Sequence, residues 1–325
     1  MKTPSAAWPL GKTNAWRRGA NQLVEPDCGA GQLMRIHNLK HSHPALGLLL
    51  LLVVFTTACN IVSGPPSFVS PLYVANSGSN NILIYAAFTN GNTGPANTIR
   101  GTGTGLSGPS GITLNAAGQI FVANSSAKSI TVYPLGANGV AVPIRTIIGA
   151  LTLLDNPQGI ALDAAGNLYV ANAGATTSSI TVYAPGAGGA PGTPATNVAP
   201  IRTISGALTL LDKPQGVIVD ATGILYVANA GATSSITVYA PGAGGAPGTP
   251  ATNVPPIRTI SGTSTGLASP QGVVLDPTGR LYVANNITPS ITVYSPGAMG
   301  NAIPIRTITG GATLLSQPLL IALRP

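Results

Sequence analysis

Residues 71–325 consist of short apolar runs instead of long helical stretches. Each run spans about four to seven residues, is rich in Val, Ile, Leu, Tyr and Thr, and is bounded by Gly, Pro, Asn or Asp. Runs of this kind between turn residues predict β-strands. They are almost continuously apolar and do not alternate with charged residues, so we expect sheets that are covered on both faces.

The runs recur in a fixed order, PQGIALD, LYVAN, SITVY and PIRTI, with small variations. The Asn that ends each LYVAN-like run is predicted to cap the turn that follows. Repeats of about 50 residues with four strand-like runs are typical of β-propeller blades. The five Asn positions mark five copies: Asn76, Asn124, Asn172, Asn229 and Asn285.

The sequence therefore predicts an all-β propeller of five four-stranded blades over residues 71–325. PIRTI is expected outermost, because an edge strand tolerates Pro and a charge, and PQGIALD innermost. The chain ends on an inner-strand run, 317–325, that no LYVAN follows, whereas the first LYVAN has no inner strand before it. We expect the C-terminal strand to close the first blade.

The segment PQGIALDAAGNLYVAN at 157–172 resembles NHL repeats and related bacterial propeller repeats. The resemblance covers about residues 71–325 and implies the propeller fold, with little about function. NHL propellers more often have six blades, so six blades is the alternative to five.

The N-terminal part resembles an export signal. Residues 45–58, ALGLLLLLVVFTTA, are too short for a membrane span of about 20 residues and fit the apolar centre of a secretion signal. The sequence TTAC, ending at Cys59, resembles a bacterial lipobox, in which the Cys becomes the lipidated first residue, although Thr56 stands where Leu is usual. An ordinary cleaved signal with an incidental Cys is the alternative.

This part of the chain divides into three predicted segments. A signal starting at Met34 has a normal length, so residues 34–58 are predicted as the signal peptide. Residues 1–33 are then a misread upstream sequence or a disordered extension. Residues 59–70 form a lipidated linker ahead of the propeller.

Composition limits the chemistry of the propeller. Charged residues make up 7% of the chain, and although the net charge is +8, six of the basic residues precede residue 45. The rest forms no basic stripe, so no nucleic-acid partner is expected. No His or Glu follows residue 43, which disfavours transition-metal catalysis and a His general base. We expect no cofactor and no metal, with Ca²⁺ on Asn, Asp and carbonyl oxygens as an open alternative.

The candidate ligand-binding residues follow the start of each inner strand, on the face where propellers usually bind ligands. Ordinary loop hydrogen bonding is the alternative interpretation. They are Ser110, Gln158, Gln215 and Gln271.

Other polar residues have predicted structural roles. The Asp residues before Ala-Ala-Gly and similar segments are expected to cap turns, and Asp155 and Asp212 to cap loops. The Gly/Pro-rich loops 184–200 and 240–256 are expected to be spacers. One Arg per blade is predicted to protect the sheet edge, or else to form a positive ring for an anionic polymer: Arg100, Arg145, Arg202, Arg258 and Arg306.

These features favour a non-catalytic, monomeric binding or scaffolding propeller, lipid-anchored in the cell envelope (periplasmic or surface-facing) and touching the membrane through its anchor alone. Its expected partner is an envelope protein or glycan. One alternative is a propeller enzyme of the lyase or lactonase type. Another is a structural surface protein that associates with itself.

Overall fold

The computed structural model describes residues 71–87, 89–175, 177–189, 196–245, 253–319 and 321. All of them belong to a compact unit that spans Gly64–Pro325. The predicted extension 1–33, signal 34–58 and linker 59–70 with Cys59 lie outside the described residues. No helix of the described part is long and apolar enough to cross a membrane.

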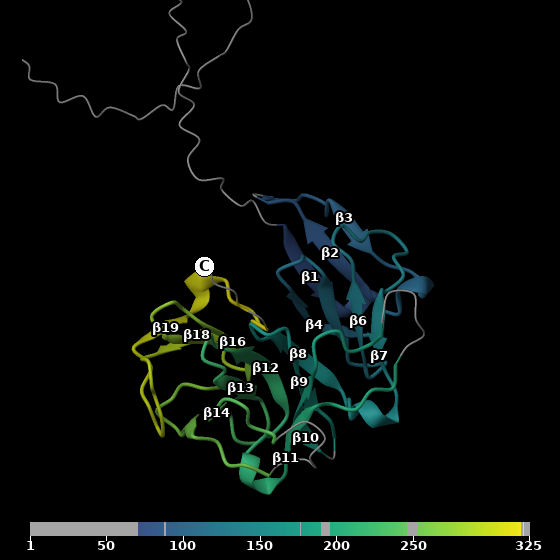
Figure 1. Ribbon diagram of the computed structural model, residues 1–325. Helices are drawn as coiled ribbons and strands as arrows, with labels where there is room; N and C mark the ends of the chain where they lie inside the picture. Colours follow the sequence, from purple (N-terminus) through teal and green to yellow (C-terminus); the bar gives the residue numbers. More distant parts are fainter. Residues whose placement is uncertain are drawn as a thin grey trace, which may run out of the picture. The chain divides into compact units, whose positions relative to one another are not determined.

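Nineteen strands of the described residues form five antiparallel sheets (Figure 1). The first blade contains β1 (Leu72–Asn76), β2 (Asn81–Tyr85) and β3 (Asn97–Ile99). The second contains β4 (Pro109–Leu114), β5 (Ile120–Asn124), β6 (Ser129–Tyr133) and β7 (Arg145–Ile147). The third contains β8 (Pro157–Leu162), β9 (Leu168–Ala173), β10 (Ser178–Tyr183) and β11 (Arg202–Ser205). The fourth contains β12 (Pro214–Val219), β13 (Leu225–Asn229), β14 (Ser235–Tyr239) and β15 (Arg258–Ser261). The fifth contains β16 (Pro270–Leu275), β17 (Leu281–Asn285), β18 (Ser290–Tyr294) and β19 (Arg306–Thr309).

The predicted all-β propeller of five blades is confirmed, and its strands follow the order of the sequence runs. The PQGIALD strands of successive blades lie side by side, and PIRTI forms the far edge of each sheet. Helix is limited to single 3₁₀ turns in the described residues: η1 (Ser77–Ser79), η2 (Thr102–Thr104), η3 (Ala150–Thr152), η4 (Ala207–Thr209) and η5 (Gly311–Thr313).

The first blade has three described strands, and β1 pairs there only with β2. The segment predicted to be its fourth strand, 317–325, falls largely on residues outside the description. Closure of the first blade by this segment therefore stays a prediction.

Glycine allows the inner strands to approach one another. A Cβ atom on Gly111, Gly159 or Gly216 would lie 2.1, 2.2 or 2.3 Å from a backbone carbonyl oxygen of the next blade's inner strand. No real side chain tolerates such a contact, so the Gly of the PQG run is required by crowding near the axis.

Each pair of successive blades meets in an apolar interface, which we call a joint. In the joint of the second and third blades, Val132 and Ile147 pack against Leu168, Val170 and Tyr183, and all are almost fully buried. The other three joints repeat this pattern. Because both faces of a middle blade are covered, its strands contain apolar residues on both sides.

A tyrosine hydroxyl forms a hydrogen bond across each joint. The last residue of the third strand donates from its OH group to the carbonyl of the Thr in the preceding blade's 3₁₀ turn or its equivalent. The pairs are Tyr133 to Thr104, Tyr239 to Thr209 and Tyr294 to Thr265, each at 2.6 Å, and Tyr183 to Thr152. Burial raises the pKa of Tyr133 and of Tyr294 to about 12.

A buried asparagine holds the linker that enters each of the last four blades. In the third blade, Asn172 Nδ2 donates to Thr181 Oγ1 at 3.0 Å, and Asn172 Oδ1 accepts the Asp155 N–H at 3.1 Å. Asn124, Asn229 and Asn285 make the same contacts. The prediction that these residues cap the following turn is wrong for these four blades, since their carbonyl oxygen binds a linker that lies before the blade's first strand.

We expect Asn172→Leu to lower the free energy of unfolding by about 2–4 kcal/mol, because the partly buried Asp155 N–H and the buried Thr181 hydroxyl each lose a hydrogen-bond partner. Urea unfolding followed by fluorescence measures the change. The control is Asn76→Leu, since Asn76 is only partly buried and donates to Asn81. It should cost less than about 1 kcal/mol. Equal losses at the two positions would contradict the role assigned to Asn172.

The joint tyrosines also predict an alkaline limit of stability. The pKa of Tyr133 is about 12 in the folded chain and about 10 when unfolded, so the folded state holds this proton more tightly. Its contribution to stability is complete below pH 10 and is lost as the pH rises towards 12. The difference in tyrosinate absorbance between the wild type and Tyr133→Phe gives this pKa directly. Ionisation near pH 10 in the folded protein would refute the buried joint.

Candidate functional site

The four residues predicted to bind a ligand occupy the second position of four successive inner strands. The structure brings them together around the axis, since each strand lies against the next. All four are half-buried. They are Ser110, Gln158, Gln215 and Gln271.

Their observed hydrogen bonds are local. Ser110 Oγ donates to the Pro157 carbonyl at 2.7 Å, which links the second and third blades. Gln158 Nε2 donates to Asn156 Oδ1 at 2.8 Å, and Gln271 Nε2 donates to Ser269 Oγ at 3.1 Å. Gln215 is bound more weakly to Lys213 O, at 3.4 Å. The Ser110 hydroxyl is thus used in a hydrogen bond between two blades. The glutamine side chains bond only to residues two positions earlier in the chain, so they link no blades.

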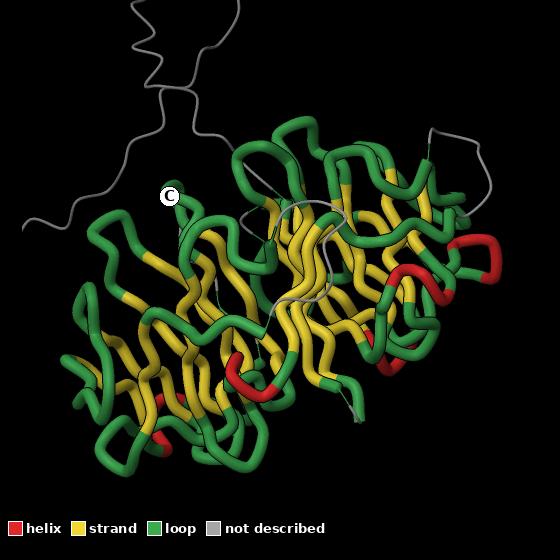
Figure 2. Tube along the Cα trace, turned by 60° about the horizontal axis from the view of Figure 1, so that its bottom comes forward, coloured by secondary structure: helices red, strands yellow, loops and turns green. Residues whose placement is uncertain are grey.

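Two leucine-bearing 3₁₀ turns lie at the same end of the blades (Figure 2). We define the leucine turns as residues 150–154 and 207–211. Each follows an outer strand and leads into the inner strand that carries Gln158 or Gln215.

The leucine turns contain backbone strain that packing does not offset. Leu153 and Leu210 both have φ of 57°, the left-handed region, which costs a side-chain-bearing residue about 1–2 kcal/mol. Gly105 and Gly266 occupy the equivalent position in other blades, with φ of 70° and 68°. Yet Leu153 and Leu210 are 52% and 54% exposed. Strained residues cluster at sites that bind other molecules, so this strain makes the leucine turns a candidate binding surface.

A second leucine in each turn enlarges the apolar surface. Leu151 and Leu208 are also exposed, beside Leu153 and Leu210 in the chain. None of these leucines is among the candidate residues predicted from the sequence. The signal was available, because aligning GALTLLD with the GTGTGLS of another blade puts Leu in a Gly position.

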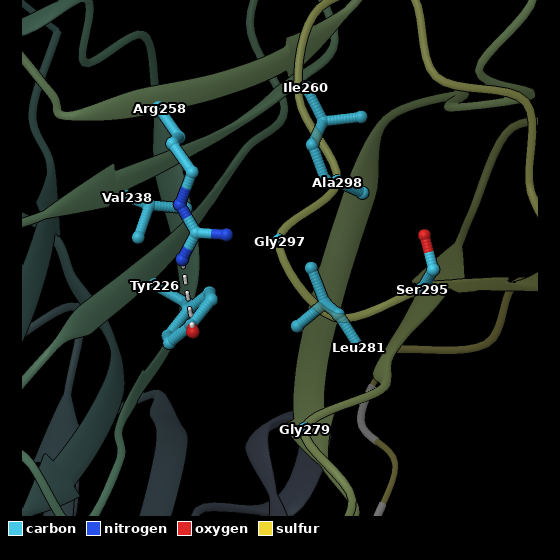
Figure 3. A pocket seen from close by; sticks show the side chains of 9 residues that line it. All are labelled: Tyr226, Val238, Arg258, Ile260, Gly279, Leu281, Ser295, Gly297 and Ala298. Carbon is cyan, nitrogen blue, oxygen red and sulfur yellow. Dashed lines mark hydrogen bonds between the residues drawn. The ribbon is translucent and has the colours of Figure 1, made fainter.

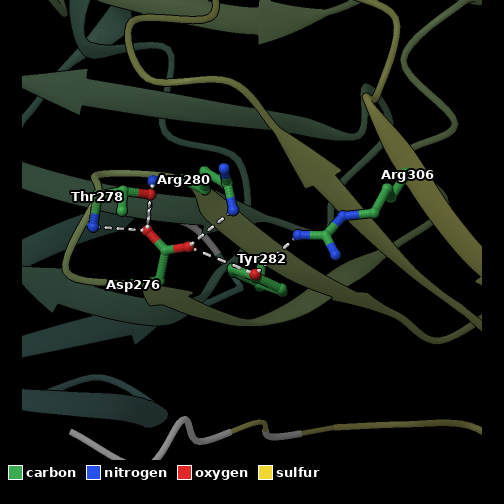
Figure 4. Close-up of polar contacts among 5 residues, drawn as sticks. All are labelled: Asp276, Thr278, Arg280, Tyr282 and Arg306. Carbon is green, nitrogen blue, oxygen red and sulfur yellow. Dashed lines mark hydrogen bonds and ion pairs between the residues drawn. The ribbon is translucent and has the colours of Figure 1, made fainter.

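The aspartates of the hairpin turns have the predicted capping role. Asp163 Oδ1 accepts the N–H groups of Ala165 and Asn167 at 3.0 and 2.8 Å. Asp276 repeats this arrangement and also bonds the hydroxyl of Thr278, and these hydrogen bonds lower its pKa (Figure 4). Asp220 does the same in the fourth blade.

The two remaining aspartates are also engaged. Asp212 Oδ2 accepts the Ala232 N–H at 2.7 Å, which confirms its predicted loop-capping role. Asp155 instead pairs with Lys128 of the preceding blade at 2.7 Å. In the described part of the chain, no group of three or more His, Cys, Asp or Glu residues could hold a metal ion.

The outer-strand arginines of four blades contact aromatic side chains of their own blades. Neither predicted role, edge protection or a positive ring for an anionic polymer, included such contacts. Arg202 lies 5.8 Å from the ring centre of Tyr169 and donates to its hydroxyl at 2.9 Å. Arg145 stacks on Phe121, and Arg306 donates to Tyr282 (Figure 4). These contacts fix the guanidinium groups within their own blades.

Arg100 does not belong to this set. Asn97 pairs with Ile84 as Arg145 pairs with Val132, so Asn97 occupies the place of the arginine and Arg100 lies three positions beyond it. The predicted series of five equivalent arginines is wrong at the first blade, where NTIRG replaces PIRTI and shifts the Arg.

A small hollow lies between the fourth and fifth blades, beside Arg258, Tyr226 and Leu281 (Figure 3). Its volume of about 10 Å³ leaves room for about one water molecule. It is a packing defect in a joint and does not resemble a ligand pocket.

The described ends of the Gly/Pro loops 184–200 and 240–256 form hydrogen bonds with the preceding blade. They are therefore not the free spacers that the sequence predicted. The N–H of Thr196 donates to the Thr146 carbonyl at 3.0 Å, and Asn197 Oδ1 accepts the Leu151 N–H at 2.8 Å. Residues 190–195 and 246–252 of these loops lie outside the description. The described loop ends thus cover the outer strand and hold the leucine turn.

No protein-family model matches this sequence, and no curated protein matches it. Solved structures do match, and they are β-propellers. One chain from a nidogen/laminin complex has a TM-score of 0.52 and 18% identity, covering 77% of this chain and 80% of that one. A periplasmic gluconolactonase of Pseudomonas aeruginosa has a TM-score of 0.50 and 17% identity, covering 75% and 69%.

A third match is a protein of unknown function from Bacteroides caccae, with a TM-score of 0.51, 15% identity and coverage of 74% and 73%. The chain is a β-propeller. At these identities the likeness shows the fold alone, so the function of this propeller has to be argued from its own surface.

We expect Leu153→Gly to leave the free energy of unfolding unchanged or to raise it by up to about 1 kcal/mol, because it relieves the left-handed strain and removes no buried contact. Its neighbour Leu154 is buried in the joint, so Leu154→Gly should cost at least about 3 kcal/mol. Thermal unfolding of the two variants tests this contrast. A similar loss for both would show that Leu153 serves the fold.

Proposed function

We propose that this protein is an extracytoplasmic binding or scaffolding propeller whose partner docks on the leucine turns, with Gln158 and Gln215 beside them. The observation that carries the proposal is the pair Leu153 and Leu210, strained and half-exposed where sister blades have glycine. A surface that keeps such residues without a folding benefit is suited to contact another molecule.

The chemistry of this surface favours a protein partner over a glycan. Leu151, Leu153, Leu208 and Leu210 offer apolar area and no hydrogen bonds, which suits apolar side chains of a partner. The glutamine amides at the axis add polar contacts at the edge. The match to a chain from a nidogen/laminin complex supports the idea that this fold can serve in binding.

A lactonase-type enzyme is the second candidate, supported by the match to a periplasmic gluconolactonase. All five aspartates of the propeller make local contacts in turns, loops or an ion pair, and residues 71–325 contain neither His nor Glu. A general acid or base is therefore harder to assign than an apolar docking surface.

The proposed location rests on the sequence outside the described residues. The apolar segment 45–58 and the lipobox-like sequence before Cys59 support export and lipid anchoring. The NHL-like repeat and the match to a periplasmic protein agree with an extracytoplasmic propeller.

The test is affinity capture from a solubilised envelope fraction, with the full chain as bait. We expect the double variant Leu153→Gly/Leu210→Gly to lose capture of the partner by at least about tenfold. Gln158→Ala/Gln215→Ala should weaken it less. The matched control is Leu135→Gly, because Leu135 is also exposed, at 68%, but lies in a turn at the other end of the blade.

Capture that is unchanged by the leucine variants would remove this site from consideration. Hydrolysis of gluconolactone by the purified protein, lost on treatment with a chelator, would favour the enzyme instead.

A further inference from the structure

The outer strands of the first, second and fourth blades are covered by a loop of the next blade, which we call the covering loop. One residue of each covering loop bridges the outer strand in parallel: Gly139 on β3, Thr196 on β7 and Gly300 on β15. No described residue bridges β19, the outer strand of the fifth blade, and all four of its residues are exposed (Figure 1). The outer edge of β19 is therefore open in the described part of the chain.

The covering loops bind the strand edge through two backbone hydrogen bonds. The N–H of Gly300 donates to the Thr259 carbonyl at 2.6 Å, and its carbonyl accepts the Ser261 N–H at 2.9 Å. Gly139 and Thr196 make the same pair of bonds with β3 and β7. By strand register, the Thr307 carbonyl and the Thr309 N–H hold these places in β19. Both groups face away from β18, and no described group bonds to them.

The residue after the bridge caps the turn that follows the outer strand. Asn301 Oδ1 accepts the Ser264 N–H at 2.8 Å, and Asn197 and Asn253 cap the turns of the second and third blades in the same way. The equivalent group after β19 is the N–H of Ala312 in η5, to which no described side chain bonds. The open edge of β19 thus continues into an uncapped turn.

An alanine of each covering loop packs beside the isoleucine of the outer strand. Ala298 belongs to the apolar cluster of Ile260, which is 2% exposed. Ala137 belongs in the same way to the cluster of Ile99. Ile308 of β19 is 50% exposed, so the apolar contact is missing as well as the hydrogen bonds.

The charge of the last outer strand does not guard its edge. Arg306 donates to the Tyr282 hydroxyl at 3.2 Å, which directs its guanidinium towards its own blade (Figure 4). An unpaired strand edge without a guarding charge is a template for pairing with another chain.

We propose that β19 binds an extended segment of a partner protein, which pairs with it in parallel as an added strand. The covering loops specify the chemistry of this segment. It has a small residue at the bridge, an alanine two residues before it and an asparagine after it, as in Ala298-Met299-Gly300-Asn301. It carries no charge near the bridge, since loops 134–143 and 295–304 contain no charged residue. This surface is separate from the leucine turns, so it does not depend on the docking proposed there.

The probe is the synthetic peptide PGAMGNAIP, residues 296–304 of this chain, which covers β15 in the structure. Amide hydrogen exchange of the full chain in detergent is measured with and without it. In the free chain we expect the Thr309 amide to exchange at least about tenfold faster than the Ser261 amide, because only the latter is bonded. Saturating peptide should slow the Thr309 amide by at least about tenfold. Slow exchange in the free chain would mean that another part of the same chain covers β19 and would overturn the proposal.

Altered peptides test the geometry of the added strand. A fluorescent PGAMGNAIP should bind the full chain saturably in an anisotropy titration. Its Gly300→Pro version lacks the N–H for the Thr307 carbonyl and should bind at least about tenfold more weakly. Its Asn301→Ala version lacks the cap for η5 and should also bind more weakly. Equal binding of all three peptides, or no binding of the unaltered one, would contradict strand addition.

A change in the chain itself locates the peptide on the fifth blade. Ile308→Arg removes the apolar contact of β19 and should weaken binding at least about tenfold. The matched control is Ile287→Arg, an exposed isoleucine of the same blade outside β19, which should bind as the wild type does. Both side chains are half-exposed or more, so the changes spare the folded core. Equal affinity of the two variants would place the peptide elsewhere and refute the assignment to β19.

Discussion

Burial of both faces of each blade against its neighbours is the constraint on which this structure depends. Only 7% of the residues are charged, and the apolar clusters lie between blades, not within one common core. Each sheet alone would expose an apolar face to water, so a blade is stable only through its joints. The stability of the fold is therefore close to a sum over nearest neighbours.

Apolar packing alone would not fix how two blades are aligned, and the buried polar groups supply that specificity. Asn172, Thr181 and Tyr183 lie among apolar side chains, and each finds its partner only in the correct alignment of linker, strand and preceding turn. A shifted blade would leave these groups unpaired at a cost of several kcal/mol. The same set recurs in four joints, which explains why these polar residues persist inside an otherwise apolar interface.

The strands, their order and the blade count could be predicted from the sequence, because each run is a local pattern repeated five times. The role of Asn172 could not, since its partner N–H lies in a linker 17 residues earlier and is identified only by packing. The displacement of Arg100 is a matter of strand register, in which Asn97 and not Arg100 occupies the place of Arg145. Leu153 was overlooked because its strain is a backbone property, visible only when the blades are aligned with one another.

Leu153 and Leu314 both stand in a turn position where other repeats have glycine, but in two different settings. Leu153 has a backbone conformation that favours Gly in a blade whose joints are complete, so its exposed side chain has no partner to gain within the molecule. Leu314 has the same conformation in a turn that no following blade covers. Local conflict with the fold is expected where a surface serves something else. The first conflict is the basis of the docking surface proposed on the leucine turns, where the side chains of Leu153 and Leu210 are exposed.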